Sequence, residues 1–178
     1  MPQYDRRHWR HWIDANRICR NTRHEVLVDE SLIVPTFKTA ELCQVLSGEW
    51  LAPYSATEVT ESTKLDIDHM VPLGNAHRSG GWNWDADRKR EYANNLDDNY
   101  HLIAVTASAN RSKGAKGPEE WQPPDQTYRC QYATDWVLIK SIGQRGGVDG
   151  PGRDARHLRS TAGGRATERV PAGRCSYP

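Results

Sequence analysis

The chain has 178 residues, of which 37% are hydrophobic, so it can build one compact core but not two. Lys and Arg number 24 and Asp and Glu 23, which excludes a protein that attracts polyanions through its overall charge. No apolar run in the sequence is long enough to cross a membrane.

Charge is unevenly distributed along the chain. Residues 141–178 contain seven arginines and three acidic residues, a net charge of +4, so the first 140 residues carry −3. Eight glycines fall between residues 143 and 178, where large apolar residues almost vanish. We therefore expect one domain at residues 1–143, followed by a flexible Gly- and Arg-rich tail at 144–178.

The N-terminal third predicts a helix, a strand and a hairpin. Apolar residues at helical spacing favour a helix over residues 5–19. Residues 25–28 form a short apolar run typical of a strand. Two further apolar runs, at 43–46 and 49–51, are separated by Ser47 and Gly48, which predicts a hairpin with its turn at the glycine.

The middle of the chain predicts a strand, a connection, a second strand and a helix. Residues 65–71 alternate apolar and polar side chains, the period of a strand with one polar face. A helix from about residue 85 to 93 begins at a capping Asp85. The next elements are a strand at 101–105, a helix at 106–113 that ends at Gly114, and a last helix at 128–140.

Four cysteines stand at positions 19, 43, 130 and 175 without a C-x-x-C pair, which argues against a zinc ribbon. Two disulfides, Cys19–Cys43 and Cys130–Cys175, are the pairing that we favour, and four free thiols are the alternative. Disulfides indicate a location outside the cytosol. The sequence starts with polar and basic residues, so a secreted protein of this sequence would be a mature form that has lost its signal peptide.

The predicted strand, strand and helix bring together residue types that suit phosphodiester hydrolysis. His69 can take a proton from water near neutral pH. Asp68 and Asn110 offer oxygen ligands of the kind that Mg²⁺ or Mn²⁺ prefers. Asn99 can accept a hydrogen bond from one ring nitrogen of His69 and so fix its tautomer. Each signal is weak alone, and their conjunction carries the hypothesis.

One geometric condition follows from the period of a strand. Asp68 and His69 are neighbours, and a regular strand sends neighbouring side chains to opposite faces. For both residues to serve one site, the strand must end or bulge at this point. Pro72, just beyond, favours that interpretation.

The segments 65–73 (Leu-Asp-Ile-Asp-His-Met-Val-Pro-Leu), 98–105 and 110–114 (Asn-Arg-Ser-Lys-Gly) together resemble the HNH signature of the ββα-metal, or His-Me finger, nucleases. More narrowly, the chain resembles small, often secreted bacterial HNH nucleases related to the DUF1524 group. The resemblance extends from about residue 4 to 140. It implies an α+β domain with a ββα-metal core at about residues 64–114, an N-terminal helix and hairpin, and a C-terminal helix.

The resemblance also implies roles for individual residues. His69 corresponds to the general base, Asp68 and Asn110 to the metal ligands, and Asn99 to the residue that orients the base. Asn95 is the alternative for this last role. Asp and Asn stand where many relatives use histidine ligands, which favours a hard ion over zinc.

Further residues are candidates for secondary roles. Lys113, Arg111 and Arg78 are expected to contact phosphate, with solvated surface charges as the alternative. Arg23 and Glu25 either support the site or form an ordinary ion pair.

The sequence therefore predicts a secreted, bacterial, metal-dependent endonuclease that hydrolyses DNA, with RNA as a further candidate substrate. No recognition module is evident, which favours low sequence specificity, and neither a protein partner nor membrane association is predicted. Two alternatives remain. One is a sequence- or structure-selective HNH nuclease of a restriction or phage system, and the other is a non-catalytic HNH fold that binds nucleic acid.

Overall fold

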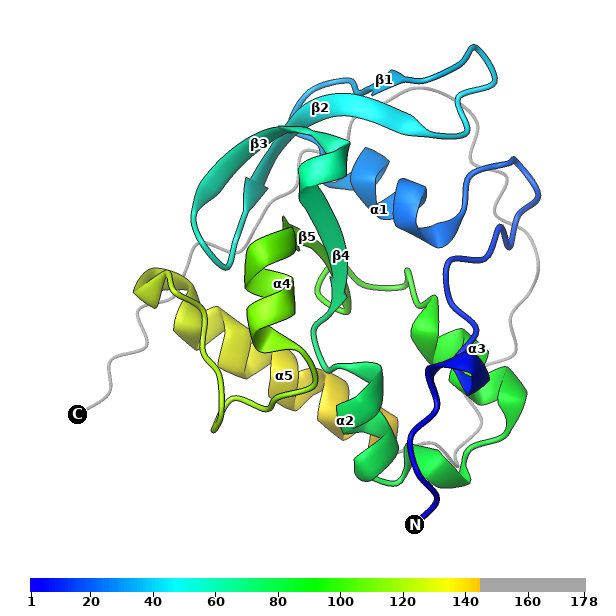
Figure 1. Ribbon diagram of the computed structural model, residues 1–178, viewed down its shortest axis with the longest axis vertical. Helices are drawn as coiled ribbons and strands as arrows, with labels where there is room; N and C mark the ends of the chain where they lie inside the picture. Colours follow the sequence, from blue (N-terminus) through cyan, green and yellow to red (C-terminus); the bar gives the residue numbers. More distant parts are fainter. Residues whose placement is uncertain (145–178) are drawn as a thin grey trace.

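Two small antiparallel sheets and five α-helices make up residues 1–144, which the computed structural model describes (Figure 1). The first sheet has the order β1 (Thr36–Phe37), β2 (Val45–Ala52) and β3 (Thr57–Glu61). The second pairs β4 (Leu65–His69) with β5 (Leu102–Thr106). The predicted mixed α+β class is confirmed. None of the described helices has the length and apolar character needed to cross a membrane.

The β4–β5 ladder and helix α4 (Ala107–Lys113) form one continuous unit, which Figure 1 shows near its centre. The ladder runs without a register shift from the pair Leu65 and Thr106 to the pair His69 and Leu102. Helix α4 follows β5 directly and packs on both strands. The two strands and the helix predicted in this region are therefore present.

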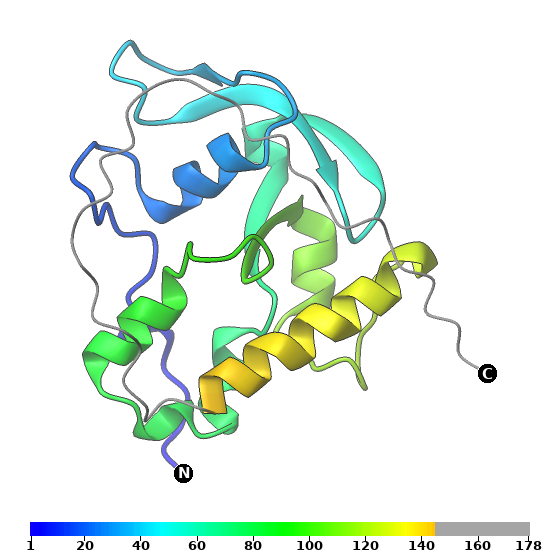
Figure 2. The ribbon, with the colours of Figure 1, turned by 180° about the vertical axis from the view of Figure 1, so that it is seen from behind.

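The two faces of the β4–β5 ladder support separate clusters of buried residues. Leu65 and Ile67 face the cluster shared with β2 and with helix α1 (Thr22–Asp29). Ile103 and Val105 face the other cluster, to which helix α5 (Arg129–Gln144) contributes. Seen from behind, α5 runs diagonally across the molecule beside α4 (Figure 2). The ladder is thus covered on both sides.

The helix predicted over residues 5–19 is wrong. Only a 3-10 turn at Arg6–His8 forms, and the chain then continues without regular structure. Trp12 and Cys19 have φ angles of 57° and 70°, which no right-handed helix allows. The carboxylate of Asp14 accepts hydrogen bonds from the amides of Ile18 and Cys19, and this local turn competes with a helix.

The strand predicted at residues 25–28 is also wrong, because this segment lies within helix α1. Asn21 is its N-cap, and the side chain of Asn21 accepts a hydrogen bond from the amide of His24. The buried residues of this helix are Thr22, Val26 and Leu27.

The predicted hairpin around Gly48 is a single strand instead, since β2 continues through this glycine. A Cβ atom at Gly48 would lie 2.6 Å from Ser31 Oγ and 2.7 Å from the ring of Trp50. The glycine therefore permits a close approach and makes no turn. The chain turns at residues 53–56, between β2 and β3.

Two further helices follow β4. Helix α2 (Leu73–Arg78) was not predicted, and α3 (Ala86–Ala93) was, including its cap by Asp85. The predicted last helix corresponds to α5, preceded by a 3-10 turn at Gln126–Tyr128.

The predicted disulfide Cys19–Cys43 is present and joins the irregular N-terminal segment to the loop before β2. Cys130 is disulfide-bonded as well. Its predicted partner, Cys175, lies outside the described residues, as does the predicted tail from residue 145 onward.

Candidate functional site

Asp68 and His69 are the last two residues of β4, and each side chain is only 5% exposed. Their side chains have different neighbours. Asp68 contacts Lys113 of α4, whereas His69 lies against Trp12. β4 includes both residues, and it neither ends nor bulges between Asp68 and His69, as one shared site was expected to require. The alternation of a regular strand therefore holds for this pair.

The imidazole of His69 is fixed by the backbone. Its Nε2 lies 3.0 Å from the carbonyl oxygen of Ala93, at the end of α3. A carbonyl only accepts hydrogen bonds, so Nε2 carries the ring proton and Nδ1 keeps the lone pair. Nδ1 has no hydrogen-bond partner within residues 1–144. It is not one of the fully buried atoms that are left unpaired there, so it keeps some exposure to solvent. Burial, reinforced by the nearby His101, holds the pKa of His69 well below its ordinary value.

Aromatic rings form the walls around this imidazole. The ring of Trp12 is stacked on it, with centroids 5.6 Å apart and planes at 28°. The ring of His101 meets it edge-on at 6.2 Å. Asn94 holds the segment that carries Trp12, because its side chain accepts from the amide of Ile13 and donates to the carbonyl of Arg10. Trp12 and Asn94 were not predicted as site residues.

The structure does not bring Asn99 or Asn95 to His69. Asn99 is exposed, and no hydrogen bond joins it to His69 within residues 1–144. The side chain of Asn95 accepts from the amide of Asp97 in a local turn. The carbonyl of Ala93 makes the contact that was expected of Asn99. A backbone carbonyl has no signature in the sequence, which is why this partner was missed.

Lys113 is fully buried beneath the site. Its ammonium donates to Asp68 Oδ2 and to the carbonyl oxygens of His69 and Met70, at 3.0 and 2.8 Å. The hydroxyl of Tyr54 donates to the same Oδ2 at 2.7 Å and lies 3.1 Å from the ammonium. Burial lowers the pKa of Lys113, and the charge of Asp68 opposes this shift. Lys113 was expected to contact phosphate at the surface, and the structure encloses it in the interior instead.

Asn110 projects from α4 toward a different carboxylate. Its amide nitrogen donates to Asp66 Oδ2 at 3.0 Å. Since Asp66 and Asp68 alternate with Ile67 on β4, both carboxylates face α4. Asp68 and Asn110 thus lie on two packed elements, each with a different hydrogen-bond partner.

Arg23 supports the beginning of the same strand. Its guanidinium donates to the carbonyl oxygens of Ser62 and Leu65 at 3.0 and 2.9 Å. Glu25 forms an ion pair with Arg20 at 3.2 Å. Of the two roles expected for these residues, Arg23 supports β4, whereas Glu25 forms an ordinary ion pair.

The oxygen atoms around α4 and β4 fit a hard divalent ion better than a soft one. Asp68 and Asn110 each retain one oxygen, Oδ1, that has no hydrogen-bond partner within residues 1–144. No group of three or more His, Cys, Asp or Glu side chains suited to a metal occurs in the same residues. A site with two protein oxygens suits Mg²⁺, which keeps several waters and binds substrate phosphate.

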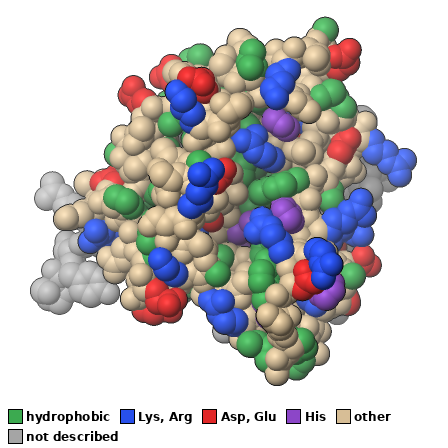
Figure 3. Space-filling model, viewed as in Figure 1, with side chains coloured by type: hydrophobic (Ala, Val, Ile, Leu, Met, Phe, Trp, Pro, Cys, Tyr) green, Lys and Arg blue, Asp and Glu red, His purple; other side chains and the backbone are tan. Residues whose placement is uncertain are grey.

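Arg78 and Arg111 are exposed at the surface, and Arg78 donates to the carbonyl of Ala115. Figure 3 shows Lys, Arg and His side chains gathered around a hollow in the middle of the face seen in Figure 1. Positive groups are therefore available on this face despite the acidic balance of residues 1–140.

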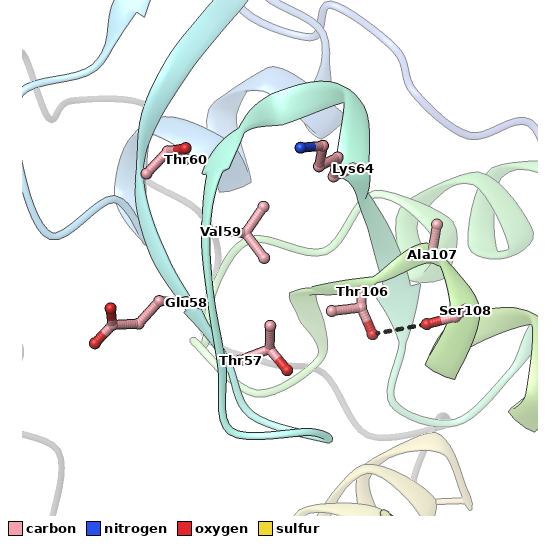
Figure 4. A pocket seen from close by; sticks show the side chains of 8 residues that line it. All are labelled: Thr57, Glu58, Val59, Thr60, Lys64, Thr106, Ala107 and Ser108. Atoms are coloured by element: carbon pink, nitrogen blue, oxygen red, sulfur yellow. Dashed lines mark hydrogen bonds between the residues drawn. The ribbon is translucent and has the colours of Figure 1, made fainter.

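A separate hollow of about 440 Å³ lies between β3 and the beginning of α4 (Figure 4). Hydroxyl groups line part of it, and Ser108 donates to Thr106 there at 3.4 Å. Thr106 pairs with Leu65, at the opposite end of the β4–β5 ladder from His69. The hollow is therefore distinct from the surroundings of the imidazole.

Comparisons with known proteins place the chain in a family. Residues 23–144 match the family described as the C-terminal domain of GmrSD restriction endonucleases. The chain is also 40% identical over 139 residues to an uncharacterized secreted protein of Arthroderma benhamiae, and the alignment covers 78% of this chain and 66% of that protein. No solved structure matches the chain. Because the family match extends over more than half of the sequence, this protein belongs to the family of GmrSD restriction endonuclease C-terminal domains.

Proposed function

We propose that this protein is a metal-dependent endonuclease of the HNH type that hydrolyses phosphodiester bonds in DNA, with His69 as its general base. The observation that carries the proposal is the fixed tautomer of His69. The ring donates through Nε2 to Ala93 and leaves Nδ1 free to take a proton. Membership of a restriction endonuclease family supports the choice of nucleic acid as substrate.

In this mechanism His69 Nδ1 takes a proton from water as the water oxygen attacks phosphorus and the bond to the leaving oxygen breaks. The hydrogen bond from Nε2 to Ala93 then stabilises the imidazolium that forms. Asp68 and Asn110 would hold the divalent ion through their free oxygens. When bound, such an ion stabilises the negative charge that develops on the phosphate.

Arg78 and Arg111 are the exposed cations that we assign to phosphate contacts. Such contacts position a nucleic acid without reading its sequence. They also suit RNA, so RNA remains a second candidate substrate.

A selective nuclease is the second candidate function, and the family description favours it, because it names restriction endonucleases. Digestion of one defined plasmid separates the two candidates. Discrete fragments identify a selective enzyme, and a continuous smear identifies a general one.

We further propose that the protein works outside the cytosol. The relative from Arthroderma benhamiae is described as secreted, and the Cys19–Cys43 disulfide suits an oxidising compartment. That relative is fungal, so the bacterial origin expected from the sequence has no support. The measurement is fractionation of the producing cells with a thiol assay, and protein found only in the cytosol with free Cys19 and Cys43 would contradict this location.

The deciding experiment is plasmid cleavage by the wild type and by His69→Gln, with Mg²⁺ and with chelator. Loss of the base is expected to lower the rate by about 10²- to 10⁴-fold. His77→Gln is the matched control, because His77 is also buried and also bound through Nε2 to a backbone carbonyl, that of Pro2. Equal rates of cleavage by wild type and His69→Gln would contradict the mechanism.

A further inference from the structure

We propose that Lys113 is the resident counter-ion of the site: its ammonium compensates Asp68 before a divalent ion binds and weakens the binding of that ion. The inference deepens the proposed function and rests on it for the role of the ion. Lys113 itself would contact neither substrate nor the reacting atoms, so it is a positioning residue.

The first argument is that the buried ammonium of Lys113 has enough hydrogen-bond acceptors around it for all of its donors. The side chain is 0% exposed, although lysines are almost never buried without a partner. Its ammonium has three donors and lies within hydrogen-bond reach of four acceptors. The rings of Tyr54, Tyr132 and Trp136 lie 5.4, 5.7 and 5.9 Å from Nζ. A surface role would require Lys113 to leave all of these contacts.

The second argument concerns the oxygens of Asp68. Both Lys113 and Tyr54 donate to Oδ2, which leaves Oδ1 as the oxygen available to an ion. An ion bound there would stand beside a fixed positive charge in a region of low dielectric, where like charges repel strongly. Binding then depends on added negative charge, and the phosphate of the substrate supplies it. Low affinity for the free ion and higher affinity in the presence of nucleic acid follow.

The third argument concerns the position of the base. The same ammonium donates to the carbonyls of His69 and Met70, at the point where β4 ends. These two bonds fix the peptide that carries the imidazole without any contribution from a metal. The backbone of the site is therefore assembled before the ion arrives.

The test compares Lys113→Met with the double variant Asp68→Asn/Lys113→Met, in chelator and in Mn²⁺, without nucleic acid. Lys113→Met leaves a buried carboxylate uncompensated, so its Tm in chelator should fall by about 10 °C. Its affinity for Mn²⁺, measured by electron paramagnetic resonance, should rise by about tenfold. The double variant removes both charges and should recover part of the Tm, while the bonds to the carbonyls of His69 and Met70 stay lost.

Two controls separate charge from packing. Lys116→Met removes an exposed lysine bonded to the carbonyl of Ser112 and should change neither quantity. Tyr54→Phe removes a neutral donor to Asp68 and should leave the Mn²⁺ affinity within about threefold of wild type, because the charge of Lys113 remains.

Three outcomes would overturn the inference: a Tm of Lys113→Met in chelator equal to that of the wild type, no gain in Mn²⁺ affinity, or a double variant no more stable than Lys113→Met. If Lys113→Met does not fold in chelator, folding of the double variant supports the charge pairing and its failure overturns it. Failure of the proposed function is distinguishable, because a wild type that neither binds Mn²⁺ nor cleaves DNA leaves the Tm comparison in chelator intact.

Discussion

The indole of Trp12 is stacked on the imidazole of His69, with ring centroids 5.6 Å apart. Trp12 adopts a φ of 57°, a conformation that is costly for a residue of this size. The surrounding contacts that hold this segment, including the hydrogen bond from Ile13 to Asn94, maintain that conformation. An aromatic ring in a strained backbone beside the candidate base indicates a role in its orientation.

Trp12→Ala is therefore expected to lower kcat about tenfold with a smaller change in KM, because the imidazole loses the ring that restrains it. Trp12→Phe keeps a stacking ring and should recover most of the activity. Steady-state cleavage kinetics provide the measurement, with Trp82→Ala as control, since Trp82 is 41% exposed. A wild-type kcat in Trp12→Ala would remove Trp12 from the site.

Arg23→Met should lower the free energy of unfolding by about 2–3 kcal/mol. The substitution removes two charged hydrogen bonds to the carbonyls of Ser62 and Leu65 at the beginning of β4. Lys64→Met is the control, because its ion pair with Glu61 is exposed and should contribute less than about 1 kcal/mol. Urea denaturation measures both, and equal effects would mean that Arg23 does not fasten the strand.

Removal of the Cys19–Cys43 disulfide by the double substitution to serine should lower stability by about 3 kcal/mol, the value expected for a loop of this length. The loss arises mainly because the unfolded chain gains conformational entropy when the disulfide is absent. Denaturation of both proteins without reductant gives the difference. A variant as stable as wild type would show that hydrogen bonds alone hold residues 14–21.

Asp135 gives the protein a predictable pH dependence. Burial raises the pKa of this carboxyl to about 6, against about 4 in an unfolded chain. The folded state therefore binds the proton more tightly, and stability falls as pH rises from about 4 to 6. Asp135→Asn should remove this fall and stabilise the protein by about 1–2 kcal/mol at pH 8. Unfolding at pH 4 and pH 8 tests it, and Asp87→Asn, at an exposed position, should leave the difference unchanged.

The strand, strand and helix around the site could be predicted because their signals are local. Residues 65–69 show the period of a strand, and Gly114 has the positive φ, 56°, that its place after a helix suggests. Helix α1 was missed because the short apolar run at 26–28 has no clear period, and its true signal was the capping Asn21. Gly48 was misinterpreted because a glycine that permits close packing and one that makes a turn are identical in sequence.

The candidate site could be predicted only where side chains identify themselves by type. His69, Asp68 and Asn110 could be named as candidates from their chemistry and spacing, and their roles stay predictions. Their partners could not, because they come from distant parts of the chain: Ala93 contributes a backbone carbonyl, and Lys113 departs from the usual exposure of lysine. Long-range contacts of this kind have no period and no motif.

Ala93 and Asn94 are consecutive, and they hold the two sides of the imidazole. Ala93 accepts from His69, while Asn94 binds the segment of Trp12 through Ile13. When the end of α3 unfolds locally, the hydrogen bond of Ala93 to His69 and that of Asn94 to Ile13 are lost in one event. Residues 10–13, 93–94 and 69 should therefore behave as a single cooperative unit in hydrogen exchange, with one opening free energy shared by their protected amides.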